Sequence, residues 1–172
     1  MKLGRTGEAR QNFETSIDKS KGYKDVKREN WLAVLEVLDD FDAWKTEHFE
    51  IRSHPSETKV MEHYLPELME ASWDVLTEKY GYTPKGPVRV DSFHRNDDFS
   101  VRSVGVKGLP ALGICFGEVI GVLGPTARPV GQFSWASTAW HEFAHTITLG
   151  LSRGQVPRWL TEGLSVYEEK MR

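Results

Sequence analysis

Two histidines in this chain stand at a spacing that suits a metal ion. His141 and His145 are four residues apart, in a stretch that we expect to be helical. Residues four apart lie one above the other on one face of an α-helix, so both imidazoles can reach a single ion. Imidazole nitrogen is a preferred ligand of zinc. The spacing therefore predicts that His141 and His145 bind one Zn²⁺ ion.

Glu142 follows His141 directly and completes the pattern H-E-x-x-H. One residue further along a helix is a turn of about 100°, so this carboxylate does not easily join the same ligand set. It can instead reach a water molecule on the open side of the ion. A carboxylate there can take a proton from water whose pKa the metal has lowered to about 7. We therefore expect Glu142 to be a general base.

A catalytic zinc has three protein ligands and one open position, so a third ligand must come from elsewhere. Sixteen residues separate His145 from Glu162, which lies one turn into a predicted helix between two leucines. A carboxylate on a mostly apolar helix face needs a partner, and we expect Glu162 to be the third ligand. The alternative for the H-E-x-x-H motif is that His141, Glu142 and His145 are ordinary surface residues. The apolar flanks of His141 argue against it, because burying these groups without a partner is costly.

The elements that must position these residues follow from the spacing of apolar side chains and from the breaks between them. The predicted order is helix, strand, long helix, strands, helix, helix, and the strands cluster apart from the last two helices, which points to an α+β fold. We expect helical structure at 4–30 with a break around Lys21-Gly22, a helix at 31–44, a strand at 47–53, a helix at 57–80 ended by Gly81, a strand at 87–91, a strand or loop at 100–105, strands at 112–116 and 118–123, and helices at 134–150 and 158–170.

The composition limits the function classes. The chain has 172 residues, a net charge of −3 and interspersed acidic and basic residues, so electrostatics do not favour a nucleic-acid partner. No apolar run approaches the roughly 18–20 residues of a membrane span, and the first twenty residues lack the apolar core of a signal peptide. The compartment stays open, because Met1 need not be the start of the natural protein. The single cysteine, Cys115, excludes a disulfide within the chain and is interpreted as a small buried hydrophobe.

The sequence around these residues resembles the gluzincin zinc metallopeptidases. The segment His141-Glu-Phe-Ala-His145, the gap of sixteen residues and the segment Trp159-Leu-Thr-Glu162-Gly-Leu-Ser-Val-Tyr167 are similar to the catalytic motifs of aminopeptidase N-like enzymes and of the peptidase MA-like family. The resemblance covers about residues 135–169. It implies a zincin-like domain and hydrolysis of a peptide or protein substrate. In that family pattern His141, His145 and Glu162 hold the zinc and Glu142 is the general base.

The resemblance also implies that a strand before the motif helix binds an extended peptide by strand addition. The best candidate is the segment that begins Glu118, Val119, Ile120 and Gly121. The alternative is that this segment is an ordinary interior strand.

Two positions depart from the family pattern. Thermolysin-like enzymes place an aspartate four residues after the glutamate ligand to orient a histidine, and here that position is Val166. Ser165 or a backbone carbonyl is the expected substitute. The family also places a Tyr or His well downstream to stabilise the oxyanion, whereas ten residues follow Glu162 here. Either the domain is truncated, or the donor comes from within the chain, with Tyr167, His94 and Arg102 as candidates. A chain without this donor suggests a second hypothesis, a zinc-bearing scaffold or protein-binding module with little hydrolysis.

The N-terminal region has a different character. Gly4-x-x-Gly7-Glu8-Ala9, followed by Phe13, Ile17 and Tyr23, resembles the second half of a tetratricopeptide repeat. We therefore expect residues 1–45 to be a helical segment at the end of such a repeat region, with protein partners. Residues 46–172 are expected to form the zincin-like domain.

Overall fold

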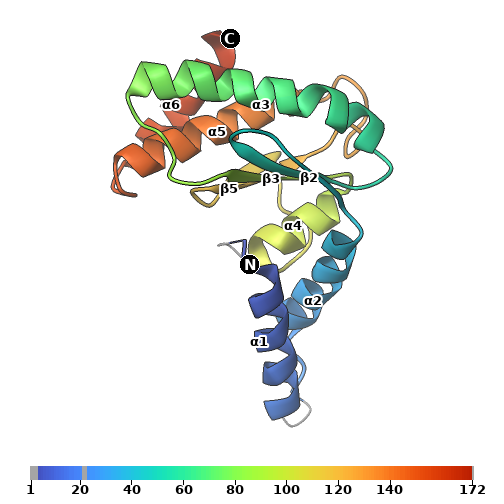
Figure 1. The fold of residues 1–172 in the computed structure, drawn as a ribbon. Helices are drawn as coiled ribbons and strands as arrows, with labels where there is room; N and C mark the ends of the chain where they lie inside the picture. Colours follow the sequence, from blue (N-terminus) through green and yellow to red (C-terminus); the bar gives the residue numbers. More distant parts are fainter. Residues whose placement is uncertain (1–3, 21–22, 172) are drawn as a thin grey trace.

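The computed structural model, which describes residues 4–20 and 23–171, is an α+β fold with one five-stranded mixed sheet (Figure 1). The break predicted around Lys21-Gly22 lies outside the described residues. The helices are α1 (Thr6–Lys19), α2 (Val26–Asp39), α3 (Thr58–Tyr80), α4 (Asn96–Val104), α5 (Trp135–Leu151) and α6 (Arg158–Met171), and the strands are β1 (Asp42–Lys45), β2 (Phe49–Ser53), β3 (Val88–Phe93), β4 (Gly113–Cys115) and β5 (Val119–Leu123).

The sheet has the strand order β1-β2-β3-β5-β4. The three central strands are parallel, with Val90 of β3 paired to Ile51 of β2 and to Ile120 of β5. The outer strands β1 and β4 pair antiparallel with their neighbours. Strand β5 is therefore hydrogen-bonded on both sides, and β4 is an edge strand.

Helices cover both faces of the sheet. Helices α3, α5 and α6 lie on one side, and α4, α2 and α1 extend from the other (Figure 1). Side chains alternate between the two faces of a strand. Val90 and Ile120 accordingly belong to the core that contains Phe143 of α5, whereas Phe93 and Leu123 belong to the core under α4 and α2. The first core fixes α5 against the sheet.

Most of the predicted elements are confirmed to within a few residues. The long helix α3 ends where glycine permits a left-handed backbone, at Gly81 with φ 61°. The predicted strands 112–116 and 118–123 form the antiparallel pair β4 and β5. The helices that carry the H-E-x-x-H motif and Glu162 occupy Trp135–Leu151 and Arg158–Met171.

The helix predicted at 31–44 is wrong at both ends. Helix α2 begins earlier, because the Asp25 carboxylate accepts hydrogen bonds from the backbone N–H groups of Lys27 and Arg28 and caps it. It ends at Asp39, and Trp44 belongs to β1. Phe41 and Trp44 continue the helical spacing of apolar residues. Periodicity alone therefore predicted one helix where the chain forms helix α2 and strand β1.

The strand or loop predicted at 100–105 is instead part of helix α4. Asp97 and Asp98 lie in its first turn, where negative charge is favourable at the positive end of the helix dipole. Gly105, with φ 81°, ends it. The valines at 101 and 104 favour strand by propensity, but Val101 is buried against the sheet as a helical residue.

The N-terminal helices form a projection from the sheet (Figure 1). Phe13 of α1 stacks on Trp31 of α2 with ring centroids 5.3 Å apart. A division between residues 1–45 and 46–172 stays a prediction, and β1, at the end of the first segment, belongs to the sheet. Within the described part of the chain, no helix combines the length and apolar character of a membrane span.

Candidate metal centre

Helix α5 presents one face to a cavity and buries the other in the core. Its start is capped by Ser134, whose hydroxyl accepts a hydrogen bond from the Ser137 backbone N–H at 3.1 Å. Five residues at helical spacing line the cavity: Thr138, His141, Glu142, His145 and Leu149. The spacing of the motif therefore directs both imidazoles and the Glu142 carboxylate into the same space.

The turn between α5 and α6 places Glu162 opposite the histidines. The Gly154 N–H donates to the Leu149 carbonyl at 2.7 Å, and Gly154 has φ 74°, so the last turn of α5 is closed by a glycine. Pro157 directly precedes α6, which packs against α5. Glu162 lies one turn into α6, and its carboxylate faces His141 and His145.

The distances among these side chains suit a small cation. Glu162 Oε2 lies 3.6 Å from His141 Nε2 and 3.5 Å from His145 Nε2. One ligand atom from each residue falls within 4.8 Å of the others. Tetrahedral bonds of 2.0–2.1 Å place neighbouring ligand atoms roughly 3.3 Å apart, close to the observed spacing. Two imidazoles and a carboxylate are also the ligand types that zinc accepts, so the residues fit the ion.

The second nitrogen of each imidazole is held by a residue of α6. His141 Nδ1 lies 3.3 Å from Glu169 Oε2, and His145 Nδ1 lies 2.7 Å from the Thr161 hydroxyl. The Thr161 hydroxyl is in turn 2.6 Å from that of Thr148. These contacts orient the rings so that both Nε2 atoms face Glu162.

The prediction that Ser165 takes the place of the missing aspartate is wrong. Its hydroxyl is buried and has no hydrogen-bond partner among the described residues. Glu169 orients His141 instead, from a position seven residues after Glu162. Seven residues are about two helical turns, so both carboxylates lie on one face of α6.

The site is partly buried, and burial shifts the pKa values of two of its ionisable groups. Burial lowers the pKa of His145, and the neighbouring His141 adds to this effect. A neutral imidazole is the form that binds a metal. Burial, with a further contribution from the Glu162 carboxylate, raises the pKa of Glu142 to about 8. Because the Glu162 carboxylate disfavours the charged form of Glu142, a cation beside them would be favourable.

Strand β4 passes directly against the Glu142 carboxylate. A Cβ atom on Gly113 would lie 2.5 Å from Glu142 Oε1, so only glycine allows this approach of strand to helix. Glu142 is 6% exposed. The free edge of the sheet and the predicted general base therefore border the same space.

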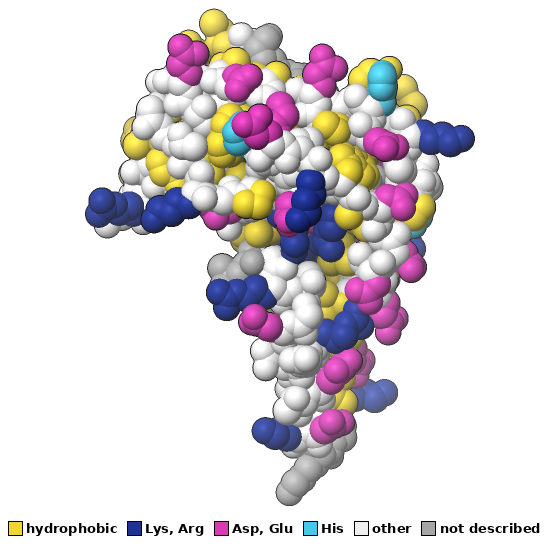
Figure 2. All heavy atoms as spheres, in the orientation of Figure 1, with side chains coloured by type: hydrophobic (Ala, Val, Ile, Leu, Met, Phe, Trp, Pro, Cys, Tyr) yellow, Lys and Arg dark blue, Asp and Glu magenta, His cyan; other side chains and the backbone are white. Residues whose placement is uncertain are grey.

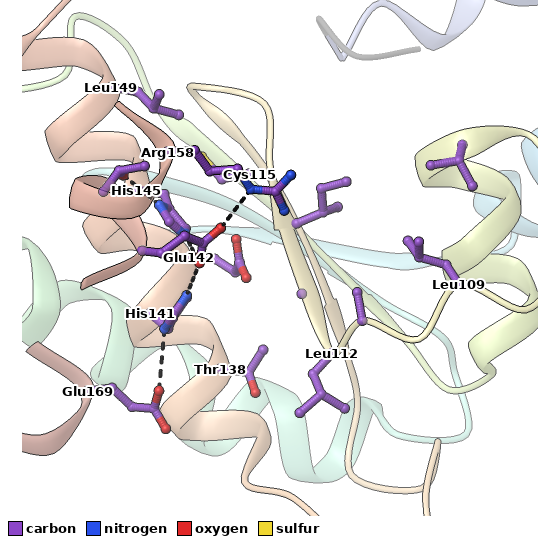
Figure 3. A pocket seen from close by; sticks show the side chains of 16 residues that line it. Leu109, Leu112, Cys115, Thr138, His141, Glu142, His145, Leu149, Arg158 and Glu169 are labelled. Carbon is purple, nitrogen blue, oxygen red and sulfur yellow. Dashed lines mark hydrogen bonds and ion pairs between the residues drawn. The ribbon is translucent and has the colours of Figure 1, made fainter. Parts of the chain in front are cut away.

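The cavity has a volume of ≈ 580 Å³ and two unlike walls (Figure 3). Helices α5 and α6 supply polar groups, among them three carboxylates, from Glu142, Glu162 and Glu169. Arg158 is the one arginine or lysine among the described lining residues. The opposite wall is apolar and is lined by Val104, Leu109, Ala111, Leu112 and Ile114.

The predicted substrate-binding residues lie elsewhere. Val119, Ile120 and Gly121 are buried in β5, which β3 and β4 flank on both sides, and Glu118 accepts a hydrogen bond from the Lys85 backbone N–H. The interior-strand alternative describes this segment, because no backbone edge is left for an added strand. β4 is the edge strand beside the cavity.

The three candidate oxyanion donors do not line the cavity either. Tyr167 follows Glu162 by five residues, which turns it roughly 140° away around α6, and its ring lies beneath Lys79 Nζ. His94 stacks on His54 with centroids 3.6 Å apart. Arg102 is buried 3.8 Å from Asp91 on the far side of the sheet.

Sequence reasoning missed four residues that shape the site: Thr161, Gly113, Arg158 and Glu169. The spacing of Glu162 and Glu169 could have revealed the last of these. Gly113 gave no signal, because its role depends on which strand lies against α5.

In comparisons with known proteins, no family model, curated protein or solved structure matched the chain. The site therefore rests on its own residues and their geometry.

Proposed function

We propose that this chain is a zinc-dependent metallopeptidase of the gluzincin type. The observation that carries the proposal is the convergence of His141, His145 and Glu162, with one ligand atom from each within 4.8 Å of the others, beside the buried Glu142. Zinc bound there would polarise a scissile carbonyl and make water more acidic. The apolar wall and the free edge of β4 suit an extended peptide.

The chain's own residues provide the proton transfers. Glu142 would hold the attacking water and accept its proton, and it would later deliver that proton to the leaving amine. Glu169 and Thr161 would keep His141 and His145 in the orientation that leaves both Nε2 atoms available. Hydrolysis is then balanced, because the water supplies the hydroxyl of the new acid and the proton of the new amine.

Strand β4 is the proposed backbone contact for substrate. It pairs with β5 on one side only, and its three residues all line the cavity. An extended peptide could add to this edge through main-chain hydrogen bonds. This position keeps the scissile bond near Glu142, because Gly113 approaches that carboxylate.

A second candidate function is a zinc-bearing protein-binding module. The observation that favours it is the position of Tyr167, His94 and Arg102, all of which lie outside the cavity wall. Removing one donor that stabilises an oxyanion costs about 10²–10³-fold in turnover, so a site without such a donor would be slow.

The test combines zinc content with turnover of a peptide library. We expect one zinc per chain in the wild type and cleavage that a chelator abolishes. Glu142→Gln should retain zinc and lose about 10²–10⁴-fold in turnover, because general-base catalysis is removed. Glu67→Gln, which makes the same change at an exposed glutamate of α3, is the matched control. Full activity of Glu142→Gln would overturn the mechanism, and zinc without wild-type cleavage would favour the module.

A further inference from the structure

Arg158 is the one cationic side chain among the described residues that line the cavity. It is the first residue of α6, directly after Pro157, and its Nε lies 3.5 Å from Glu162 Oε1. Its side chain leaves α6 on the side that faces strand β4 (Figure 3). The guanidinium therefore stands beside the proposed metal ligands without being one of them.

Its exposure decides between two roles. A donor that stabilises an oxyanion acts best where water is excluded. The Arg158 side chain is 91% exposed, whereas the neighbouring imidazoles are 16% and 10% exposed. A solvated guanidinium at the mouth of a cavity is better suited to meet a charged group that the substrate brings. Arginine binds carboxylates through two parallel hydrogen bonds, which makes the contact selective.

Among the described residues, the other charged groups around the cavity are negative, so Arg158 is the group there that can attract a substrate carboxylate. Glu142, Glu162 and Glu169 would repel an incoming carboxylate, and Arg158 offers it an attractive partner. The ion pair between Arg158 and Glu162 does not compete strongly, because exposed pairs at i, i+4 on a helix contribute little. The apolar wall opposite, which includes Leu109 and Leu112, offers room for an aliphatic side chain.

We propose that Arg158 makes the cavity selective for peptides that carry a carboxylate next to an aliphatic residue. This inference rests on the proposed peptidase function, since it assigns the substrate class of that site. The carboxylate is either the C-terminal α-carboxylate or an acidic side chain, and both present the same two oxygens to the guanidinium.

The test measures binding without turnover. Zinc-loaded Glu142→Gln protein is titrated by calorimetry with three synthetic peptides: Ala-Leu-Leu-Leu with a free C-terminus, the same peptide amidated, and amidated Ala-Leu-Asp-Leu. The titrations are repeated with Arg158→Gln and with Arg153→Gln. Arg153 is exposed and lies outside the cavity wall. Arg153→Gln removes the same positive charge as Arg158→Gln, so it is the matched control.

Arg158→Gln should weaken binding of a carboxylate peptide about fivefold, which corresponds to about 1 kcal/mol, and should leave binding of amidated Ala-Leu-Leu-Leu unchanged. Arg153→Gln should change none of the three, and zinc content should stay the same throughout. If Arg158→Gln weakens binding of the peptide with the free C-terminus, the α-carboxylate is recognised. If it weakens binding of the peptide with the aspartate, the acidic side chain is recognised. Equal weakening of all peptides, or no weakening in any, would overturn the inference. Absence of wild-type cleavage would overturn only the proposed hydrolysis.

Discussion

Each imidazole of the site contacts a residue of α6 through Nδ1 and faces the Glu162 carboxylate with Nε2. His141 is held through Nδ1 by the Glu169 carboxylate, and His145 is held through Nδ1 by the Thr161 hydroxyl. The two Nε2 atoms are thereby turned towards Glu162. The tautomer that carries its proton on Nδ1 is the one that leaves Nε2 able to bind a metal. The group that could hold a metal was predictable from sequence, whereas the residues that contact its Nδ1 atoms depend on which face of α6 packs against α5.

Glu169→Gln should weaken zinc binding about 10–100-fold, because the carboxylate that orients His141 is replaced by a neutral amide. Competition with a fluorescent chelator measures the affinity. Glu78→Gln, an exposed carboxamide on α3, should bind zinc as the wild type does. Wild-type affinity in Glu169→Gln would show that the contact between Glu169 and His141 does not support the ligand set.

At the scale of elements, the site depends on how two helices are held together. The spacing of His141, Glu142 and His145 predicted helix α5 and its cavity face correctly, because i and i+4 positions coincide on a helix. The sequence predicted that α6 lies beside α5, because a zinc site on His141 and His145 needs a third ligand and Glu162 was the candidate. Strand β4 could not be chosen over β5 as the edge, since strand order is decided by packing among distant segments. The start of α2 was missed for a different reason, because Asp25 caps the helix locally and a cap does not show in the apolar periodicity.

Helix α6 is also anchored to α3 through a buried carboxylate. Glu168 is 3% exposed, accepts a hydrogen bond from the Tyr80 hydroxyl at 2.6 Å and pairs with Lys79 Nζ at 2.8 Å. A buried carboxylate needs such partners. This anchor holds α6 in the orientation that directs Glu162 and Glu169 towards α5.

Tyr80→Phe should lower the free energy of unfolding by about 1–3 kcal/mol, because the buried Glu168 Oε1 loses the Tyr80 hydrogen bond and keeps only its ion pair with Lys79. Urea denaturation at pH 7 measures the loss. Tyr64→Phe, on the exposed side of α3, is the control and should change stability little.

The same pair predicts a dependence on pH. Burial, together with the Glu168 carboxylate, raises the pKa of the Tyr80 phenol above its ordinary value. A group whose pKa is raised on folding contributes stability that is complete below the unfolded pKa, about 10, and is lost as pH rises above it. Wild-type stability should therefore decline above about pH 10 more steeply than that of Tyr80→Phe. Identical slopes would mean that Tyr80 ionises as freely in the folded chain as in the unfolded one.

At the scale of the whole molecule, the sheet separates two regions. Helices α3 and α5 pack on one face, and α4 packs on the other, with α2 and α1 extending from it (Figure 1). The cavity lies at the β4 edge and is lined by α5, α6, β4 and the chain that leads from the end of α4 into β4. The cavity's three carboxylates belong to a surface that is otherwise mixed in charge, as Figure 2 shows for one side of the molecule. The negative charge of the site is thus local, and a divalent cation would relieve it where α5 meets α6.

Zinc should therefore stabilise the folded chain as a whole. An ion that binds the native state at 100 times its dissociation constant adds about 2.7 kcal/mol. For a chain of this length that corresponds to a rise in Tm of about 5–11 °C, since 1 kcal/mol shifts Tm by about 2–4 °C. Scanning calorimetry with and without a chelator measures the rise. His63→Asn, an exposed histidine on α3, should keep it, and Glu162→Gln should lose most of it. An equal rise in Glu162→Gln would mean that zinc binds elsewhere, because the three-ligand site requires the Glu162 carboxylate next to both imidazoles.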